Sequence, residues 1–262
     1  MLIDSHCHLD YLEDPRHGMS VADVLRRAAD AGVVHLLTVA VDRANIPRVL
    51  AHARAYPQVS ASVGIHPGSC GEDRPADEDE LVALAADPVV VAIGETGLDY
   101  HYGSDTAELQ RHSFAVHLRA ASRAGLPVIV HTREAVEDTL DIMIRNADLS
   151  HGGVMHCFTE SLEMARAAIE MNFLISFSGI ITFRNAESLR DVVCAVPLDR
   201  MLVETDSPYL APVPFRGRSN EPAYVSRVAE TVALLKGVPV EAVIEATGDN
   251  FQRLFPRANI HR

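Results

Sequence analysis

Long apolar runs are missing from this sequence. No stretch of about 18 or more apolar residues occurs, which excludes an ordinary membrane-spanning helix. The first residues, 1–6, carry neither a basic segment nor a long apolar stretch, so we expect no cleaved signal peptide. The expected location is therefore the cytoplasm, without a membrane partner.

Cysteine is scarce, and no two cysteines have the CxxC spacing of a metal-binding or redox motif. Cys7, Cys70, Cys157 and Cys194 are scattered along the chain, and we expect them to be reduced thiols. Cys7 and Cys157 each adjoin a histidine that is a candidate ligand. Because neighbouring residues of a strand point to opposite faces, we expect both cysteines to be packing residues.

Positive charge is also scarce, with 23 Lys and Arg against 36 Asp and Glu and a net charge of −13. A field of this sign repels polyanions, so it argues against broad contact with duplex DNA. Nucleic acid at a confined site remains compatible, since metal ions and a few arginines can reverse the sign locally. Lys236 is the only lysine of the chain.

The sequence does contain a regular alternation of apolar, β-rich segments with segments of helical period. The expected strands are residues 1–5, 33–41, 59–65, 89–95, 127–131, 153–156, 173–176 and 200–205. The expected helices are residues 21–31, 46–56, 107–124, 135–146, 162–171, 186–195, 223–235 and 240–255.

This alternation predicts parallel strands joined by right-handed helical crossovers, and eight such units close a barrel. We therefore predict an α/β fold, a TIM-type (β/α)8 barrel, as a single domain over residues 1–262. The alternative is an open doubly wound sheet, which usually needs a glycine-rich phosphate loop after its first strand; the sequence has none there. The proline-rich segment 208–222 is too long for a routine turn, which indicates a functional loop.

Titratable side chains stand at the C-terminal ends of several expected strands. They are His6 and His8 after the first strand, His66, Glu95, His131 and His156 after the third to sixth, and Asp206 after the eighth. In a parallel barrel these ends meet at one rim, where barrel enzymes have their active sites. Each side chain alone has an ordinary explanation, such as a core histidine, a capped turn or a salt bridge. Their convergence on one rim predicts a metal centre that activates water for hydrolysis.

The number of candidate ligands favours two ions. Leaving His66 aside, four histidines and two carboxylates exceed the three protein ligands of a common catalytic zinc site. Two divalent ions about 3.5–4 Å apart, bridged by a carboxylate, use them all. Glu95 is the natural bridge, because it lies between the two histidine groups in chain order. Some binuclear barrel hydrolases use a carboxylated lysine on the fourth strand instead, but Lys236 falls in a late helical segment.

A set of motifs resembles the TatD family of metal-dependent deoxyribonucleases. The motifs are residues 4–10 (DSHCHLD), 63–67 (VGIHP), 94–100 (GETGLDY), 131–133 (HTR), 156–158 (HCF), 204–212 (ETDSPYLAP), 216–222 (RGRSNEP) and 250–255 (NFQRLF). The resemblance covers essentially the whole chain, in order. It implies a TIM-type barrel, divalent metals, and hydrolysis of phosphodiesters with 3′–5′ exonuclease activity.

The resemblance also implies roles for single residues. His6 and His8 would hold one ion and His131 and His156 the other, with Glu95 as their bridge. Asp206 would be a ligand beside the attacking water and its proton carrier, so that Asp206 and Glu95 are the predicted catalytic residues.

Other residues have predicted roles around the metal ligands. We predict that His66 and Arg218 contact the substrate. Arg216 either shares in a positive patch or is a solvated loop residue. Glu204 either holds a ligating histidine in its metal-binding tautomer or pairs with Arg133.

These features predict a hydrolase with two divalent ions (Zn, Mn or Mg) and DNA as substrate, single-stranded or at 3′ ends, without an obligate protein partner. One alternative is an amidohydrolase-like enzyme that acts on a small ester, lactone, amide or phosphoester, since such a metal core is indifferent to what it cleaves. A second is a non-catalytic metal-binding module. Ligands on an open rim argue against the second, because structural zinc sites are usually closed and rich in cysteine.

Overall fold

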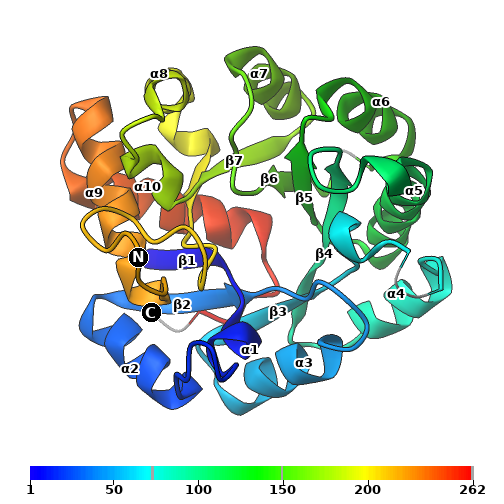
Figure 1. The fold of residues 1–262 in the computed structure, drawn as a ribbon, viewed down its shortest axis with the longest axis horizontal. Helices are drawn as coiled ribbons and strands as arrows, with labels where there is room; N and C mark the ends of the chain where they lie inside the picture. The colour runs from blue at the N-terminus through cyan, green and yellow to red at the C-terminus, as the bar shows by residue number, and fades with distance from the viewer. Residues whose placement is uncertain (72–73, 149, 261–262) are drawn as a thin grey trace.

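The computed structural model describes residues 1–71, 74–148 and 150–260. In this part of the chain, eight parallel strands form one sheet in the order β1-β2-β3-β4-β5-β6-β7-β8. Figure 1 shows the strands at the centre of the molecule with the helices around them. The predicted (β/α)8 barrel is therefore confirmed.

The strands are β1 (Leu2–Cys7), β2 (Val33–Thr38), β3 (Val59–Val63), β4 (Val90–Asp99), β5 (Val128–Arg133), β6 (Gly153–Met155), β7 (Phe173–Phe177) and β8 (Met201–Val203). The α-helices are α1 (Leu9–Leu12), α2 (Val21–Asp30), α3 (Ile46–Ala55), α4 (Glu78–Ala85), α5 (Ala107–Ala124), α6 (Val136–Asn146), α7 (Leu162–Glu170), α8 (Glu187–Ala195), α9 (Val225–Lys236) and α10 (Val240–Leu254). Short 3₁₀ helices occupy Pro67–Ser69, Ser104–Thr106, Gly179–Thr182, Leu198–Arg200 and Pro222–Tyr224. None of the helices in the described ranges is long and apolar enough to cross a membrane.

Several expectations about these elements were wrong: the short helix α1 was missed, and the second, third and eighth strands end two or three residues earlier than expected. The helix α4 was missed, because its first turn is a run of acidic residues that hides the apolar period; the carboxylate of Asp77 caps it by accepting from Glu80 N at 2.8 Å. The fourth strand was expected to end at Glu95, but β4 continues to Asp99, which pairs with Arg133 of β5. Glycines 94 and 97 weaken the local preference for a strand, and pairing with β5 overrides it.

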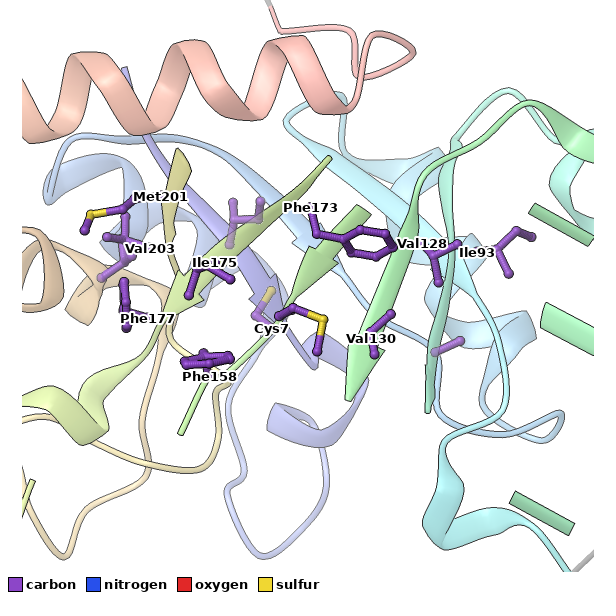
Figure 2. Packing of buried hydrophobic residues seen from close by; sticks show 14 of the residues in the cluster. Cys7, Ile93, Val128, Val130, Phe158, Phe173, Ile175, Phe177, Met201 and Val203 are labelled. Atoms are coloured by element: carbon purple, nitrogen blue, oxygen red, sulfur yellow. The ribbon is translucent and has the colours of Figure 1, made fainter. Parts of the chain in front are cut away.

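Two apolar layers hold the barrel together. The larger lies between sheet and helices, and Figure 2 shows part of it, with Cys7 and Phe158 among buried side chains of β4, β5, β7 and β8. The smaller contains Ile3, Val91 and Ile129, together with Phe251 and Phe255 from the C-terminal end of α10. Since α10 contacts both β1 and β8, these phenyl rings close one end of the barrel and leave the other end for a site.

The ladder is irregular at two predicted site residues. The β1–β2 register shifts between Asp4 and Cys7, around His6, and the β4–β5 register shifts between Ile93 and Thr96, around Glu95. Such irregularities turn side chains away from the simple alternation of a strand and occur often beside active sites. They place His6 and Glu95 in the interior, where each is at most 2% exposed.

The barrel closes between its first and last strands through residues of the same motifs. Asp206 N donates to His6 O at 2.9 Å and His8 N donates to Ser207 O at 2.8 Å. The buried Asp4 carboxylate accepts from the backbone N–H and the hydroxyl of Thr205, at 2.8 and 2.6 Å. These bonds fix the C-terminal end of β1 against the residues that follow β8.

Candidate metal centre

The predicted ligands come together at the C-terminal ends of the strands. A cavity of about 750 Å³ opens there, and its lining includes His8, Glu95, His131, His156 and Asp206. His6 lies beside them, fully buried, and shares possible metal-binding groupings with His8 and Glu95 and with His156 and Asp206. Side chains separated by up to 200 residues in the chain therefore meet in one place.

Glu95 divides its two carboxylate oxygens between two sets of histidines. Its Oε2 lies 3.4 Å from His6 Nε2. Its Oε1 lies 3.1 Å from His131 Nδ1 and 2.7 Å from His156 Nε2. This is the arrangement that a bridging carboxylate needs, because each oxygen faces a different predicted ion.

Asp206 stands on the side of the first histidine pair. Its Oδ1 is 3.4 Å from His8 Nε2 and 3.8 Å from His6 Nε2. Burial alone would raise the pKa of Asp206, but the hydrogen bond from His8 and the charges of nearby histidines lower it below its ordinary value. The carboxylate is therefore ionised at neutral pH and able to accept a proton or bind a cation.

The outer nitrogens of three histidines face oxygen atoms, and two of these contacts have hydrogen-bond geometry. His131 Nε2 lies 3.3 Å from Asp99 Oδ2 and His8 Nδ1 lies 3.1 Å from Val39 O. His156 Nδ1 lies 3.3 Å from Glu204 Oε1. When such a histidine loses the proton of its inner nitrogen, it still donates from its outer nitrogen and has a lone pair on the inner one, which is the form that binds a metal.

This tautomer leaves the inner nitrogens of His131 and His156 facing Glu95, another acceptor. Two lone pairs at hydrogen-bond distance repel each other unless a proton or a cation lies between them. Both ring nitrogens of His6 are also buried without a hydrogen-bond partner among the described residues. Burial alone would raise the pKa of the Glu95 carboxyl, but the histidines around it, His156 first, hold it well below its usual range. The donor set therefore fits divalent ions.

Of the two readings of Glu204, the geometry supports the first. Its Oε1 accepts from Cys157 N at 2.7 Å and faces His156 Nδ1. Arg133 turns away, with its guanidinium carbon 4.6 Å from the centroid of the Tyr102 ring. Glu204 is therefore placed to orient His156 rather than to pair with Arg133.

His66 shares a grouping with Glu95 and His131, but its hydrogen bonds set it apart from the ligands. Its Nδ1 accepts from Gly68 N at 2.9 Å, so in the neutral ring the proton sits on Nε2. Burial lowers the pKa of His66 to about 4, which keeps the ring neutral at pH 7. The Nε2–H lies 3.4 Å from Glu95 Oε1. A protonated nitrogen has no lone pair for an ion, so His66 is a donor facing the cavity.

The two loop arginines lie outside the lining of the cavity. Arg218 is exposed and lies outside the cavity lining, so its role stays a prediction. Arg216 lies over the ring of Phe183, 3.7 Å from its centroid, and donates to Ala211 O at 3.2 Å. Arg133 is the arginine that lines the cavity within the described ranges, although the sequence patterns did not single it out as a substrate contact.

Other residues of the site were missed from the sequence. Asp99 lines the cavity, as do three tyrosines. Burial alone would raise the pKa of Asp99, but the hydrogen bond from His131 lowers it to about 2. A two-residue period from Glu95 leads to Asp99, and would have found it had the strand been extended. Cys7 packs in the core as expected, but Cys157 borders the cavity, with its Sγ 3.3 Å from Ser178 Oγ.

A barrel whose rim gathers histidines and carboxylates around an open cavity has the architecture of a metal-dependent hydrolase. Comparison with known sequences agrees: residues 3–256 match the family described as TatD related DNase. The chain belongs to this family.

Individual relatives span nearly the whole chain. The uncharacterized metal-dependent hydrolase YcfH of Escherichia coli (strain K12) is 49% identical over 254 residues, which cover 97% of this chain and 95% of the relative. The 3′-5′ ssDNA/RNA exonuclease TatD of Salmonella typhimurium (strain LT2) is 34% identical over 238 residues, 89% of this chain and 92% of the relative. The crystal structure of YJJV, a TatD homologue from Escherichia coli K12, has a TM-score of 0.88 at 32% identity and covers 97% of this chain and 98% of that chain.

Proposed function

We propose that this metal-dependent hydrolase is a two-metal phosphodiesterase that removes nucleotides from 3′ ends of single-stranded DNA. The observation that carries the proposal is the division of Glu95 between two sets of histidines, since hydrolysis of phosphodiesters commonly uses two ions on either side of such a bridge. The relative named as a 3′-5′ ssDNA/RNA exonuclease supports the choice of substrate.

In this proposal the ligands divide into two sets. His6, His8 and Asp206 would hold one ion, His131 and His156 would hold the other, and Glu95 would offer one oxygen to each. Divalent ions in such a site acidify a water and neutralise charge on the phosphate oxygens. Zn, Mn and Mg all remain candidates, because the affinity order for these ligands does not decide which ion is used in a cell.

The protein side chains then have defined tasks. The water oxygen forms a bond to phosphorus while the bond from phosphorus to the leaving 3′ oxygen breaks. The ionised Asp206 carboxylate accepts the proton of the attacking water and returns it to the leaving oxygen. The Nε2–H of His66 donates to a non-bridging oxygen, and the Arg133 guanidinium offers a charge-assisted contact to a phosphate.

The test is cleavage of a 5′-labelled single-stranded oligonucleotide by purified protein loaded with zinc or manganese. The wild type shortens the oligonucleotide from its 3′ end, and His131→Ala loses at least about 100-fold in rate, a loss of about 2.7 kcal/mol in transition-state stabilisation. His112→Ala, which removes an exposed histidine outside the cavity, serves as the matched control and keeps its rate.

Elemental analysis tests the site separately from the substrate. About two divalent ions per chain are expected in the wild type and fewer in His131→Ala. Fewer than one ion per wild-type chain would contradict the metal centre itself. Full metal loading with equal oligonucleotide turnover in wild type and His131→Ala would refute the nuclease and favour the amidohydrolase-like alternative.

A further inference from the structure

The cavity is bordered by the exposed aromatic side chains of this protein. The sequence has eight Phe, six Tyr and no Trp. In the described part of the chain the aromatic residues classed as exposed are Tyr102, at 76%, and Tyr209, at 50%, and both line the cavity. A half-buried Tyr11 joins them there. An aromatic ring left in water adds little to the stability of the fold, so its place at the mouth of the cavity calls for a ligand.

These rings lie on opposite sides of the barrel mouth. Tyr102 follows β4 and Arg133 ends β5, whereas Tyr11 follows β1 and Tyr209 follows β8. In a barrel of eight strands in sequential order, the β4–β5 boundary is half a turn away from the β8–β1 closure. Figure 1 shows the same separation, with β1 on one side of the barrel and β4 and β5 on the other. Glu95 and its histidines lie between the two groups of rings.

The Tyr102 side of the mouth combines a ring with a positive charge. The Arg133 guanidinium carbon lies 4.6 Å from the ring centroid, and the ring of His101 stands nearly perpendicular, with centroids 4.6 Å apart. Tyr102 N donates to Asp99 Oδ1 at 2.9 Å, and this carboxylate also faces His131. The Arg133 guanidinium thus lies on the Tyr102 ring at the cavity, where it can make a charge-assisted contact with a phosphate.

The Tyr209 side is a pair of rings beside the other ligand set. The centroids of Tyr11 and Tyr209 lie 6.4 Å apart, and that of Tyr11 lies 5.4 Å from that of His8. The backbone of Tyr209 is held from two directions: its N donates to Asp206 O at 3.0 Å, and its carbonyl accepts from Asn220. The ring is thus exposed on an anchored backbone, as a rigid contact surface needs to be.

We propose that Tyr102 with Arg133, and Tyr209 with Tyr11, are two base-stacking platforms that hold the nucleosides on either side of the scissile phosphodiester. The inference rests on the proposed nuclease function and adds the contacts that select the substrate. Stacking is available to every base and depends little on the sign of the surface charge, so it suits an acidic protein that binds nucleic acid.

The two platforms favour an unpaired strand. With one ring on each side of the cavity, the two bases that flank the phosphate turn to opposite walls and cannot remain stacked on each other. Bases of a duplex would first have to unpair and unstack, which costs a few kcal/mol per nucleotide. The platforms therefore give a physical reason for a single-stranded substrate of at least two nucleosides.

The experiment uses a short single-stranded oligonucleotide with 2-aminopurine next to the scissile bond, because stacking on an aromatic ring quenches its fluorescence. Binding is measured on the full chain in a chelator, where the strand stays intact, and cleavage on the metal-loaded protein. For Tyr102→Ala and for Tyr209→Ala we expect roughly 5- to 100-fold weaker binding, the range that loss of one stacking ring gives, with less quenching and a raised KM at nearly constant kcat.

Two controls separate stacking from damage to the fold. Tyr102→Phe keeps the ring and is expected to bind within about twofold of the wild type. Ile144→Ala removes an exposed side chain, 68% exposed, from outside the cavity and is expected to bind as the wild type does. An abasic nucleotide in place of 2-aminopurine should erase the difference between wild type and Tyr102→Ala, since the partner of the ring is then absent.

The outcomes distinguish the inference from the function on which it rests. If the wild type cleaves and binds the strand while both alanine variants bind equally well, the platforms are refuted and the nuclease stands. If the metal-loaded wild type neither binds nor cleaves single strands, both proposals fall.

Discussion

His117 of α5 is a buried histidine outside the metal centre whose two ring nitrogens are both used. Its Nδ1 donates to Ser113 O at 2.7 Å, and its Nε2 accepts from Ile65 N at 2.9 Å. Only the neutral ring with its proton on Nδ1 satisfies both bonds, because a proton on Nε2 would face the N–H of Ile65. Burial lowers the pKa of His117 from 6.5 to about 4. The ring fastens α5 to the residue that precedes His66.

The contribution of the neutral His117 ring to the free energy of unfolding follows from the linkage between protonation and folding. As the pH falls, the unfolded chain protonates residue 117 near 6.5, whereas the folded chain does so only near 4. The stability that depends on the neutral ring is fully present above pH 6.5 and is lost as the pH falls from 6.5 toward 4. The complete shift corresponds to about 3 kcal/mol, of which about 2 kcal/mol is lost between about pH 7.5 and about pH 5.

The assay is urea unfolding of the wild type and of His117→Gln at these two pH values, with a chelator present so that metal release does not contribute. Gln cannot titrate, so the free energy of unfolding of the wild type should fall by about 2 kcal/mol more than that of the variant. His112→Gln, on the exposed face of the same helix, should follow the wild type. Parallel losses in wild type and His117→Gln would refute the reasoning.

Three further predictions concern ligand orientation, packing and charge. Glu204→Gln removes the carboxylate that faces His156 Nδ1 and should lower metal affinity about 10- to 100-fold, measured by competition titration against a chromophoric chelator. Unchanged affinity would mean that Glu204 serves only to bind Cys157 N. Phe177→Ala leaves a cavity at a fully buried position of β7 and should reduce the free energy of unfolding, measured by urea denaturation, by about 3–5 kcal/mol. A loss below about 1 kcal/mol would contradict the packing around Phe177. Binding of single-stranded DNA should depend only weakly on salt, because Arg133 is the arginine that lines the described cavity. The logarithm of the association constant, plotted against the logarithm of the salt concentration, should have a slope of about −0.7 to −1.4. A slope of about −4 would indicate a larger basic surface.

Much of the fold could be predicted because the spacing of apolar residues within a segment, and the order of the segments along the chain, can be read directly from the sequence. Alternating apolar segments predicted all eight strands, and their number predicted closure. The helix α4 escaped because its acidic first turn carries no apolar period, and the end of β4 escaped because pairing with β5 decides it rather than local preference. These two misses concern elements whose conformation depends on capping or on a distant partner, whereas the missed α1 has only four residues, too few to show a period.

In the candidate site, too, some features could be predicted from the sequence and others could not. The predicted ligands could be found because barrel topology brings strand ends to one rim, and the structure brings these side chains together. The hydrogen bonds that orient them could not, since the contacts of His131 with Asp99 and of His8 with Val39 O depend on side-chain directions. The position of Arg133 over Tyr102 depends on side-chain packing in the same way, so the sequence did not single out Arg133; the predicted contact of Arg218 with the substrate stays a prediction.

The closure of the barrel between β1 and β8 sets the order in which the site is completed during synthesis. His6 and His8 leave the ribosome first, and Asp206 follows about 200 residues later, which is roughly 10–40 s at ordinary rates of translation. Until then the backbone bonds of His6 and His8 to the residues after β8 have no partner. A growing chain that has not reached Asp206 therefore carries His6 and His8 without the carboxylate that lies beside them in the folded protein. The site at the rim is therefore completed only after β8 has been synthesised, and α9 and α10 follow it in the chain.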